Sequence, residues 1–121
     1  MAALKIMIVE DEIIVAKDIQ RILKKLGYEA FDPFANGKKA LDAVEKLNPD
    51  IILLDINLKS SEIDGIQVGE QIHQTYQIPF IYLTAFSDKT TLERAKLTEP
   101  YGYIIKPFEE DDIRTAIEIA F

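Results

Sequence analysis

Residues 50–55 read Asp50-Ile51-Ile52-Leu53-Leu54-Asp55, four consecutive apolar residues between two acids. A short, continuous apolar run is typical of a central strand in a parallel sheet, because such a strand is buried on both faces. The carboxyl ends of parallel strands lie along one edge of the sheet, which is where α/β folds bind ligands. We therefore expect Asp55 to lie at that edge.

Apolar runs alternate with helix-period segments along the whole chain, the pattern of a βα repeat. The predicted strands are 4–9, 28–34, 50–55, 79–84 and 101–105, and the predicted helices are 12–26, 36–47, 64–76, 88–97 and 109–120. Polar positions and Pro33 favour a sheet edge for the second strand. The fourth helix has the thinnest apolar face, chiefly Leu92 and Ala95. The sequence predicts an α/β fold in one domain, residues 1–121.

Composition narrows the class of protein. Of the 121 residues, 48% are apolar and 29% are charged, which indicates a globular rather than a disordered chain. The net charge of −7 argues against nucleic acid as a direct partner, since phosphate binding needs a basic face. No cysteine is present, so disulfides and thiolate metal sites are excluded. No membrane-length apolar run or signal peptide is visible, and we expect a cytoplasmic protein without a membrane partner.

Side chains that can carry chemistry follow four of the predicted strands. In chain order they are Glu10, Asp11, Asp55, Thr84 and Lys106-Pro107. Two carboxylates about 4 Å apart repel each other by about 4 kcal/mol near a protein surface, so this edge needs a compensating charge. A divalent cation is the simplest candidate. A cation, a free carboxylate and a lysine are the parts needed to move a phosphoryl group.

The whole chain resembles the receiver domain of two-component response regulators. The matching stretches are Ile8-Val9-Glu10-Asp11-Glu12, Leu53-Leu54-Asp55, Asp64-Gly65, Leu83-Thr84-Ala85 and Tyr103-Ile104-Ile105-Lys106-Pro107-Phe108. Their occurrence in order, at the right strand ends, makes the combination specific, although any one motif alone is weak. The resemblance implies a flavodoxin-like (βα)5 fold, a doubly wound parallel sheet of five strands in the order 2-1-3-4-5.

The resemblance implies a metal-assisted phosphoacceptor. Asp55 would accept the phosphoryl group, because a carboxylate can form an acyl phosphate. Glu10 and Asp11 match the acidic pair that holds Mg²⁺ (or Mn²⁺), with Asp55 and the backbone carbonyl of Asn57 completing the site. The family more often has Asp at the position of Glu10, and the longer Glu can reach a metal through water. Both acids also suit the start of a helix, where the dipole favours negative charge.

The remaining motif residues are implied to sense the phosphoryl group. Thr84 matches the hydroxyl that hydrogen-bonds it, and Lys106 matches the lysine that contacts the acceptor and then the phosphate. The Lys106–Pro107 bond is cis in the family, and an X-Pro bond is where a cis peptide costs least. Tyr103 matches an aromatic switch residue that moves inward when Thr84 is drawn to the phosphate. The alternative for Tyr103 is an ordinary strand aromatic with a solvated hydroxyl.

Partners also follow from the resemblance. A sensor histidine kinase or a phosphotransfer domain would donate the phosphoryl group. The surface of the fourth helix, fifth strand and fifth helix would then switch and bind a downstream protein or a fused domain. Self-catalysed transfer to Asp55 and autodephosphorylation would be its only chemistry, so we do not expect an enzyme.

The loop 56–63 is longer than usual, and Arg114 is the one arginine of the last helix. In these two features the chain is similar to receivers that are attached to sensor histidine kinases.

Two other classes of protein are weighed against this reading. A pseudo-receiver would use the same fold only as an interaction module, but the intact Asp55, Thr84 and Lys106 argue against it. An enzyme such as a flavodoxin would need a hydroxyl- and glycine-rich phosphate loop after the first strand. Glu10-Asp11-Glu12 stands there instead and would repel phosphate. A haloacid-dehalogenase-type phosphatase carries its nucleophile after the first strand, whereas Asp55 follows the third.

Overall fold

A computed structural model describes residues 3–59, 61–85 and 88–121. Within them the elements are β1 (Lys5–Val9), α1 (Ile13–Lys25), β2 (Glu29–Ala30), α2 (Gly37–Leu47), β3 (Ile51–Asp55), α3 (Gly65–Thr75), β4 (Phe80–Thr84), α4 (Lys89–Leu97), β5 (Gly102–Ile105) and α5 (Glu110–Ala120). The strands form one parallel sheet in the order β2-β1-β3-β4-β5, which confirms the predicted fold. None of these helices has the length and apolar character needed to cross a bilayer.

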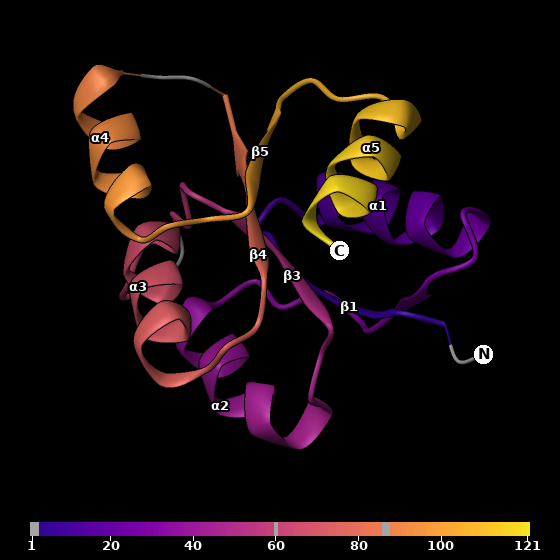
Figure 1. Ribbon diagram of the computed structural model, residues 1–121, viewed down its shortest axis with the longest axis horizontal. Coiled ribbons are helices and arrows are strands. Elements are labelled where there is room, and N and C mark those ends of the chain that lie inside the picture. The colour runs from indigo at the N-terminus through magenta and orange to yellow at the C-terminus, as the bar shows by residue number, and fades with distance from the viewer. Residues whose placement is uncertain (1–2, 60, 86–87) are drawn as a thin grey trace.

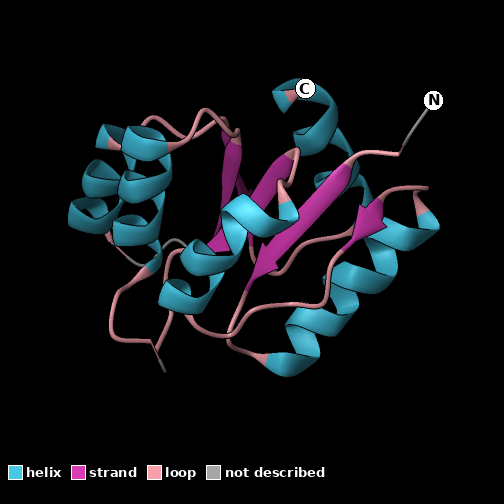
Figure 2. Cartoon of the chain, turned by 90° about the horizontal axis from the view of Figure 1, so that it is seen from below, coloured by secondary structure: helices cyan, strands magenta, loops and turns pink. Residues whose placement is uncertain are grey.

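The sheet lies between two layers of helices, with α1 and α5 on one face and α2, α3 and α4 on the other (Figures 1 and 2). Every residue of β3 is buried, because β3 is central and both of its faces are covered. Ile51 and Leu53 pack into the core beneath α1 and α5, and Ile52 and Leu54 pack into the core on the opposite face. The alternation of side chains along the strand thus builds two cores.

The second strand is shorter than the sequence predicts. We expected residues 28–34, but β2 covers Glu29–Ala30. The main-chain hydrogen bonds to β1 continue beyond the end of β2, since the Phe34 N–H donates to the carbonyl of Ile8 at 2.9 Å. Pro33 has no N–H to donate, so the ladder is interrupted just before this bond. The edge position predicted for the strand is correct.

Steric crowding requires a glycine at position 65, after β3. A Cβ at this position would overlap the main-chain carbonyl oxygen of Asp55. Its N–H donates to the carbonyl of Ile56 at 2.9 Å, and the preceding Asp64 caps α3 through a capping box with Gln67. The beginning of α3 is therefore pressed against the end of β3. The connecting loop is the longer one noted in the sequence, and its Ser60 lies outside the described residues.

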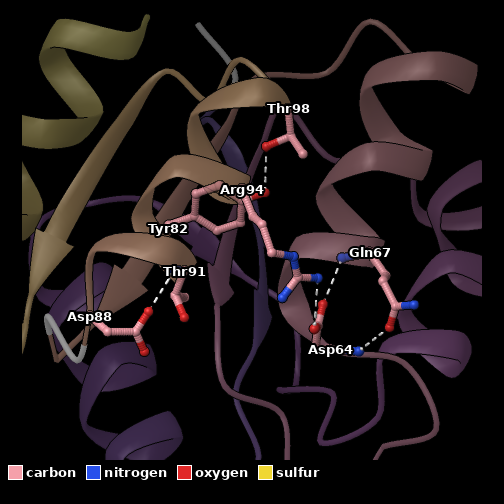
Figure 3. Close-up of polar contacts among 7 residues, drawn as sticks. All are labelled: Asp64, Gln67, Tyr82, Asp88, Thr91, Arg94 and Thr98. Atoms are coloured by element: carbon pink, nitrogen blue, oxygen red, sulfur yellow. Dashed lines mark hydrogen bonds and ion pairs between the residues drawn. The ribbon is translucent and has the colours of Figure 1, made fainter.

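Helix α4 is weakly packed, as its thin apolar face predicts. Ala95 is its buried residue. Just after the helix, the hydroxyl of Thr98 lies 2.6 Å from the hydroxyl of Tyr82 in β4, and Arg94 pairs with Asp64 of the α3 cap at 3.2 Å (Figure 3). The buried tyrosine contact anchors the C-terminal end of α4 to the sheet.

Candidate functional site at the carboxyl edge of the sheet

Three carboxylates converge at the carboxyl ends of β1 and β3. Glu10 and Asp11 follow β1 directly, and Asp55 is the last residue of β3. The two strands are hydrogen-bonded neighbours, so their ends coincide. One carboxylate oxygen from each residue lies within 4.8 Å of the others. Glu10 and Asp55 are buried and Asp11 is half-buried. The structure thus brings together the three acidic residues singled out in the sequence.

Lys106 brings a positive charge to this cluster from the end of β5. Its main-chain N–H donates to the carbonyl of Thr84 at 2.8 Å, which ties β5 to the end of β4. Its ammonium donates to Oε1 of Glu10 at 2.6 Å and lies 3.4 Å from Oδ2 of Asp55. The Lys106–Pro107 peptide bond is cis. A single lysine therefore bridges two of the three carboxylates.

Each carboxylate of the cluster also accepts a main-chain N–H. The pairs are Glu12 to Glu10 Oε2 (3.1 Å), Lys59 to Asp11 Oδ2 (2.7 Å) and Asn57 to Asp55 Oδ1 (3.1 Å). These bonds fix the orientation of each carboxylate. The role expected for Asn57 was that of a carbonyl ligand. In the structure its N–H donates to the Asp55 carboxylate.

Burial, and after it the hydrogen bond and negative charge of Glu10, raise the pKa of the Asp55 carboxyl from an ordinary 3.8 to about 7. The Asn57 N–H and the Lys106 charge lower it in part. For Lys106, burial lowers the pKa, but its hydrogen bond to Glu10 and the charges of Asp55 and Glu10 outweigh burial and raise it overall. Near neutral pH, a protonated lysine therefore stands beside a carboxyl that is partly protonated and partly ionised.

A crevice of about 340 Å³ opens beside these groups. Its lining comes from the ends of β3, β4 and β5 with the loops that follow them, from the loop after β1 and from the start of α4: Glu12, Asp55, Ile56, Asn57, Lys59, Thr84, Ala85, Asp88, Thr91 and Lys106. Thr84 is buried at the end of β4 and shares the crevice with Asp55 and Lys106. The crevice can hold a small anionic group between a cation and a hydroxyl.

A larger cavity, of about 760 Å³, lies on the other side of Lys106. Apolar side chains such as Ile14 and Phe108 line it, together with Pro107. Apart from Lys106 at its border, it contains none of the strand-end residues that carry chemistry. We therefore assign the chemistry to the smaller, polar crevice.

Tyr103 is a predicted site residue that belongs neither to the acidic cluster nor to the lining of the crevice. Its ring packs against that of Tyr82, with ring centroids 6.0 Å apart, and its hydroxyl is buried without a hydrogen-bond partner among the described residues. Conversely, sequence reasoning missed Lys59, Asp88 and Thr91. Lys59 orients Asp11 through a main-chain N–H, which leaves no side-chain signal. Asp88 shortly follows the strand-end Thr84, and that proximity was the available signal.

These features define an α/β signalling fold with an acidic, lysine-containing crevice at its sheet edge. The chain belongs to the response regulator receiver domain family, whose model matches residues 6–118. It is therefore a receiver domain of two-component signalling. Receiver domains interact with histidine kinases or phosphotransfer proteins and generally bind Mg²⁺ at an acidic pocket. In this chain Glu10, Asp11 and Asp55 form an acidic cluster.

Curated relatives cover nearly the whole chain. It is 33% identical over 116 residues to the transcriptional regulatory protein PdtaR of Mycobacterium tuberculosis, covering 96% of this chain and 56% of that protein. It is 32% identical over 115 residues to sporulation initiation phosphotransferase F of Bacillus subtilis, covering 94% of this chain and 90% of that protein. The chain spans about half the length of PdtaR and of several other regulators that it matches.

Solved structures agree with this assignment. The signal receiver domain of a modulated diguanylate cyclase from Desulfovibrio desulfuricans is 34% identical, with a TM-score of 0.92 over 98% of this chain and 93% of that one. The chemotaxis protein CheY4 of Vibrio cholerae has a TM-score of 0.88 at 23% identity, covers 99% of this chain and 100% of that one, and supports the fold alone.

Proposed function

We propose that this domain accepts a phosphoryl group on Asp55 from a sensor histidine kinase or a phosphotransfer domain. One observation carries the proposal. The Asp55 carboxylate lines an open crevice, with the Lys106 ammonium 3.4 Å from its Oδ2 and two more carboxylates within 4.8 Å. This juxtaposition of nucleophile, cation and acidic cluster is the set of parts that phosphoryl transfer requires.

The donor set fits Mg²⁺ or Mn²⁺, because it consists of oxygen atoms without thiolate or imidazole. Asp11, Asp55 and the main-chain carbonyl of Asn57 would hold the ion, with Glu10 beside them. When bound, the ion would neutralise negative charge on the transferring phosphoryl group.

The protein groups supply the remaining chemistry. A carboxylate oxygen of Asp55 attacks phosphorus, the bond from phosphorus to the donor atom breaks, and an acyl phosphate forms on Asp55. The Lys106 ammonium neutralises charge on the phosphoryl oxygens, and the Thr84 hydroxyl donates a hydrogen bond to one of them. Hydrolysis of the acyl phosphate resets the domain. We propose no catalysis on a separate substrate, so the domain is a switch rather than an enzyme.

The proposed output surface consists of α4, β5 and α5. Large apolar side chains are exposed on or beside these elements, namely Leu97, Tyr101, Ile105, Ile119 and Phe121. A downstream protein or a fused domain would cover them once phosphorylation changes the surface. We propose a cytoplasmic location, since the phosphodonors of receiver domains act there, and no direct contact with nucleic acid or membrane.

Intact-mass analysis tests the acceptor. Incubation with acetyl phosphate and Mg²⁺ should add one phosphoryl group to the wild type and none to Asp55→Asn, because the site carries its own lysine and cation ligands. A persisting mass gain in Asp55→Asn would show that another residue is the acceptor. No gain in the wild type with either acetyl phosphate or a phosphorylated donor domain would favour the pseudo-receiver, an interaction module on the same fold.

A further inference from the structure

Lys59 brings a second lysine to the crevice beside Asp55. It lines the crevice from the loop after β3, and the other lysine of the lining is Lys106. The main-chain N–H of Lys59 donates to Asp11 Oδ2 at 2.7 Å, so the backbone that carries its side chain is held at the crevice wall. The residue itself is exposed. Its ammonium is therefore tethered at the opening of the crevice.

The two lysines differ in how their charges are used. The Lys106 ammonium lies 2.6 Å from Glu10 and 3.4 Å from Asp55, so its charge is already paired inside the protein. Among the residues that the structure describes, the Lys59 ammonium forms neither an ion pair nor a hydrogen bond. Lys59 thus presents a solvated, unpaired cation to whatever enters the crevice.

The surroundings of Lys59 are otherwise acidic. The carboxylates of Glu12, Asp55 and Asp88 line the same crevice, and the whole domain has a net charge of −7. A field of this sign repels an anionic phosphodonor, and a cation at the opening offsets part of the repulsion. The charge of Lys59 therefore acts where an anionic ligand enters and leaves.

The depth of the crevice sets the direction of the reaction. Asp55 is 3% exposed and lies at the inner end, whereas Lys59 is exposed and lies at the opening. In phosphoryl transfer the attacking and leaving atoms are roughly in line on either side of phosphorus. If Asp55 attacks from the inner end, the leaving group points towards the opening and towards Lys59.

We infer that Lys59 is a specificity-determining residue that faces the leaving group and favours donors whose leaving group departs as an anion, such as acyl phosphates. The inference rests on the proposed function. With acetyl phosphate, an Asp55 oxygen bonds to phosphorus, the bond from phosphorus to the acetyl oxygen breaks, and its electron pair leaves with acetate. Negative charge then develops opposite the Lys59 ammonium, which stabilises it.

Phosphoramidate provides the contrasting donor. Its P–N bond breaks, and the protonated nitrogen takes the electron pair and leaves as neutral ammonia. No negative charge develops on this leaving group, so the Lys59 ammonium has little to stabilise. The two donors transfer the same phosphoryl group to the same carboxylate, and the difference between them isolates the leaving group.

The test compares phosphorylation rates with the two donors, followed by intact mass at saturating Mg²⁺ and low ionic strength. Lys59→Met should lower the rate with acetyl phosphate by about 5- to 10-fold and the rate with phosphoramidate by less than about 2-fold. Lys59→Arg keeps the charge and should restore the wild-type rates. Lys46→Met, in the last turn of α2 at the opposite edge of the sheet, is the matched control and should leave both rates unchanged.

Mg²⁺ affinity, measured by calorimetry, separates this role from a structural one. Lys59→Met removes a positive charge near the acidic cluster but keeps the main-chain N–H that holds Asp11, so Mg²⁺ should bind about 2-fold more tightly. Weaker Mg²⁺ binding with equal losses for both donors would mean that the substitution acts by displacing Asp11, and would overturn the inference.

The rates also distinguish failure of the inference from failure of the proposed function. A wild type that reacts with both donors, together with a Lys59→Met variant that shows the same donor preference, rejects the role of Lys59 alone. A wild type that reacts with neither donor rejects the proposed function, and the role of Lys59 falls with it.

Discussion

Two buried tyrosine hydroxyls in neighbouring strands have opposite hydrogen-bonding states. The Thr98 hydroxyl donates to the carbonyl of Ala95 at 2.7 Å, so its 2.6 Å contact with Tyr82 is donated by the tyrosine. Tyr103 buries its hydroxyl without a hydrogen-bond partner among the described residues. An unsatisfied buried polar group costs about 1–3 kcal/mol, whereas a made bond stabilises by about 1 kcal/mol.

Removing each hydroxyl should therefore change stability in opposite directions. We expect Tyr103→Phe to raise the free energy of unfolding by about 1 kcal/mol and Tyr82→Phe to lower it by about 1 kcal/mol. Urea unfolding of both variants at the same metal concentration measures the difference. Equal destabilisation by the two substitutions would mean that the Tyr103 hydroxyl has a partner in solution.

The Asp55 carboxyl makes the stability of the domain depend on pH. Its pKa is raised from 3.8 to about 7 in the folded state, first by burial and then by Glu10. Between these two values the folded domain binds more protons than the unfolded chain, so the free energy of unfolding falls as pH rises. Above about 7 the carboxyl is ionised in both states and this dependence ends.

Replacing Asp55 by asparagine should remove that dependence. In metal-free buffer, Asp55→Asn should lose less stability than the wild type between pH 5 and 8, a span that contains the Asp55 pKa of about 7. Urea unfolding at both pH values, with a chelator present, makes the comparison. Parallel losses in the two proteins would contradict the raised pKa.

Among the helices, α4 is best suited to move. Ala95 is its buried residue, so little apolar surface holds it to the sheet. The Arg94–Asp64 pair to the α3 cap is half-exposed and therefore contributes little. Asp88, the N-cap of α4, lines the same crevice as Asp55. A phosphoryl group in that crevice would act on the loosely held end of the helix, while Tyr82 and Thr98 anchor the other end.

We expect phosphorylation to perturb α4 and β5 more than α1 and α2. Pulling Thr84 towards the phosphate opens space beside Tyr103, and the thinly packed α4 can respond. Hydrogen exchange of the metal-bound domain, with and without beryllium fluoride as a phosphoryl mimic, measures this. If protection changes stay within the loops after β1 and β3, the surface does not switch and a static docking module explains the domain better.

For the whole molecule, the acidic cluster couples metal binding to folding. The carboxylates of Glu10, Asp11 and Asp55 are brought together only when β1 and β3 pair, so a cation that binds there favours the folded state. Mg²⁺ at 100 times its dissociation constant would add about 2.7 kcal/mol to the free energy of unfolding. Thermal melts should show an upward shift with Mg²⁺ that Asp11→Ala strongly reduces and Glu10→Ala reduces less. The absence of a shift in the wild type at several millimolar Mg²⁺ would contradict a metal site.

The order of strands and helices could be predicted from the sequence because it depends on local patterns. Apolar runs and helix periodicity located the five βα units, and Asp64 with Gln67 indicated the start of α3. The positions of Glu10, Asp55 and Lys106 at strand ends followed from the same patterns. Once the strands are parallel, their carboxyl ends share an edge, so the convergence of these residues required no further information.

Other features depend on three-dimensional contacts. The length of β2 depends on where Pro33 meets the ladder of β1, and the environment of Tyr103 depends on the ring of Tyr82. Whether the Lys106 ammonium lies nearer to Glu10 or to Asp55 depends on contacts between residues that are 96 and 51 positions apart in the sequence, respectively. Such contacts are set by side-chain reach and by the twist and spacing of strands, which composition and periodicity do not contain. Local patterns therefore identified the residues of the site, and only packing decided which of them touch.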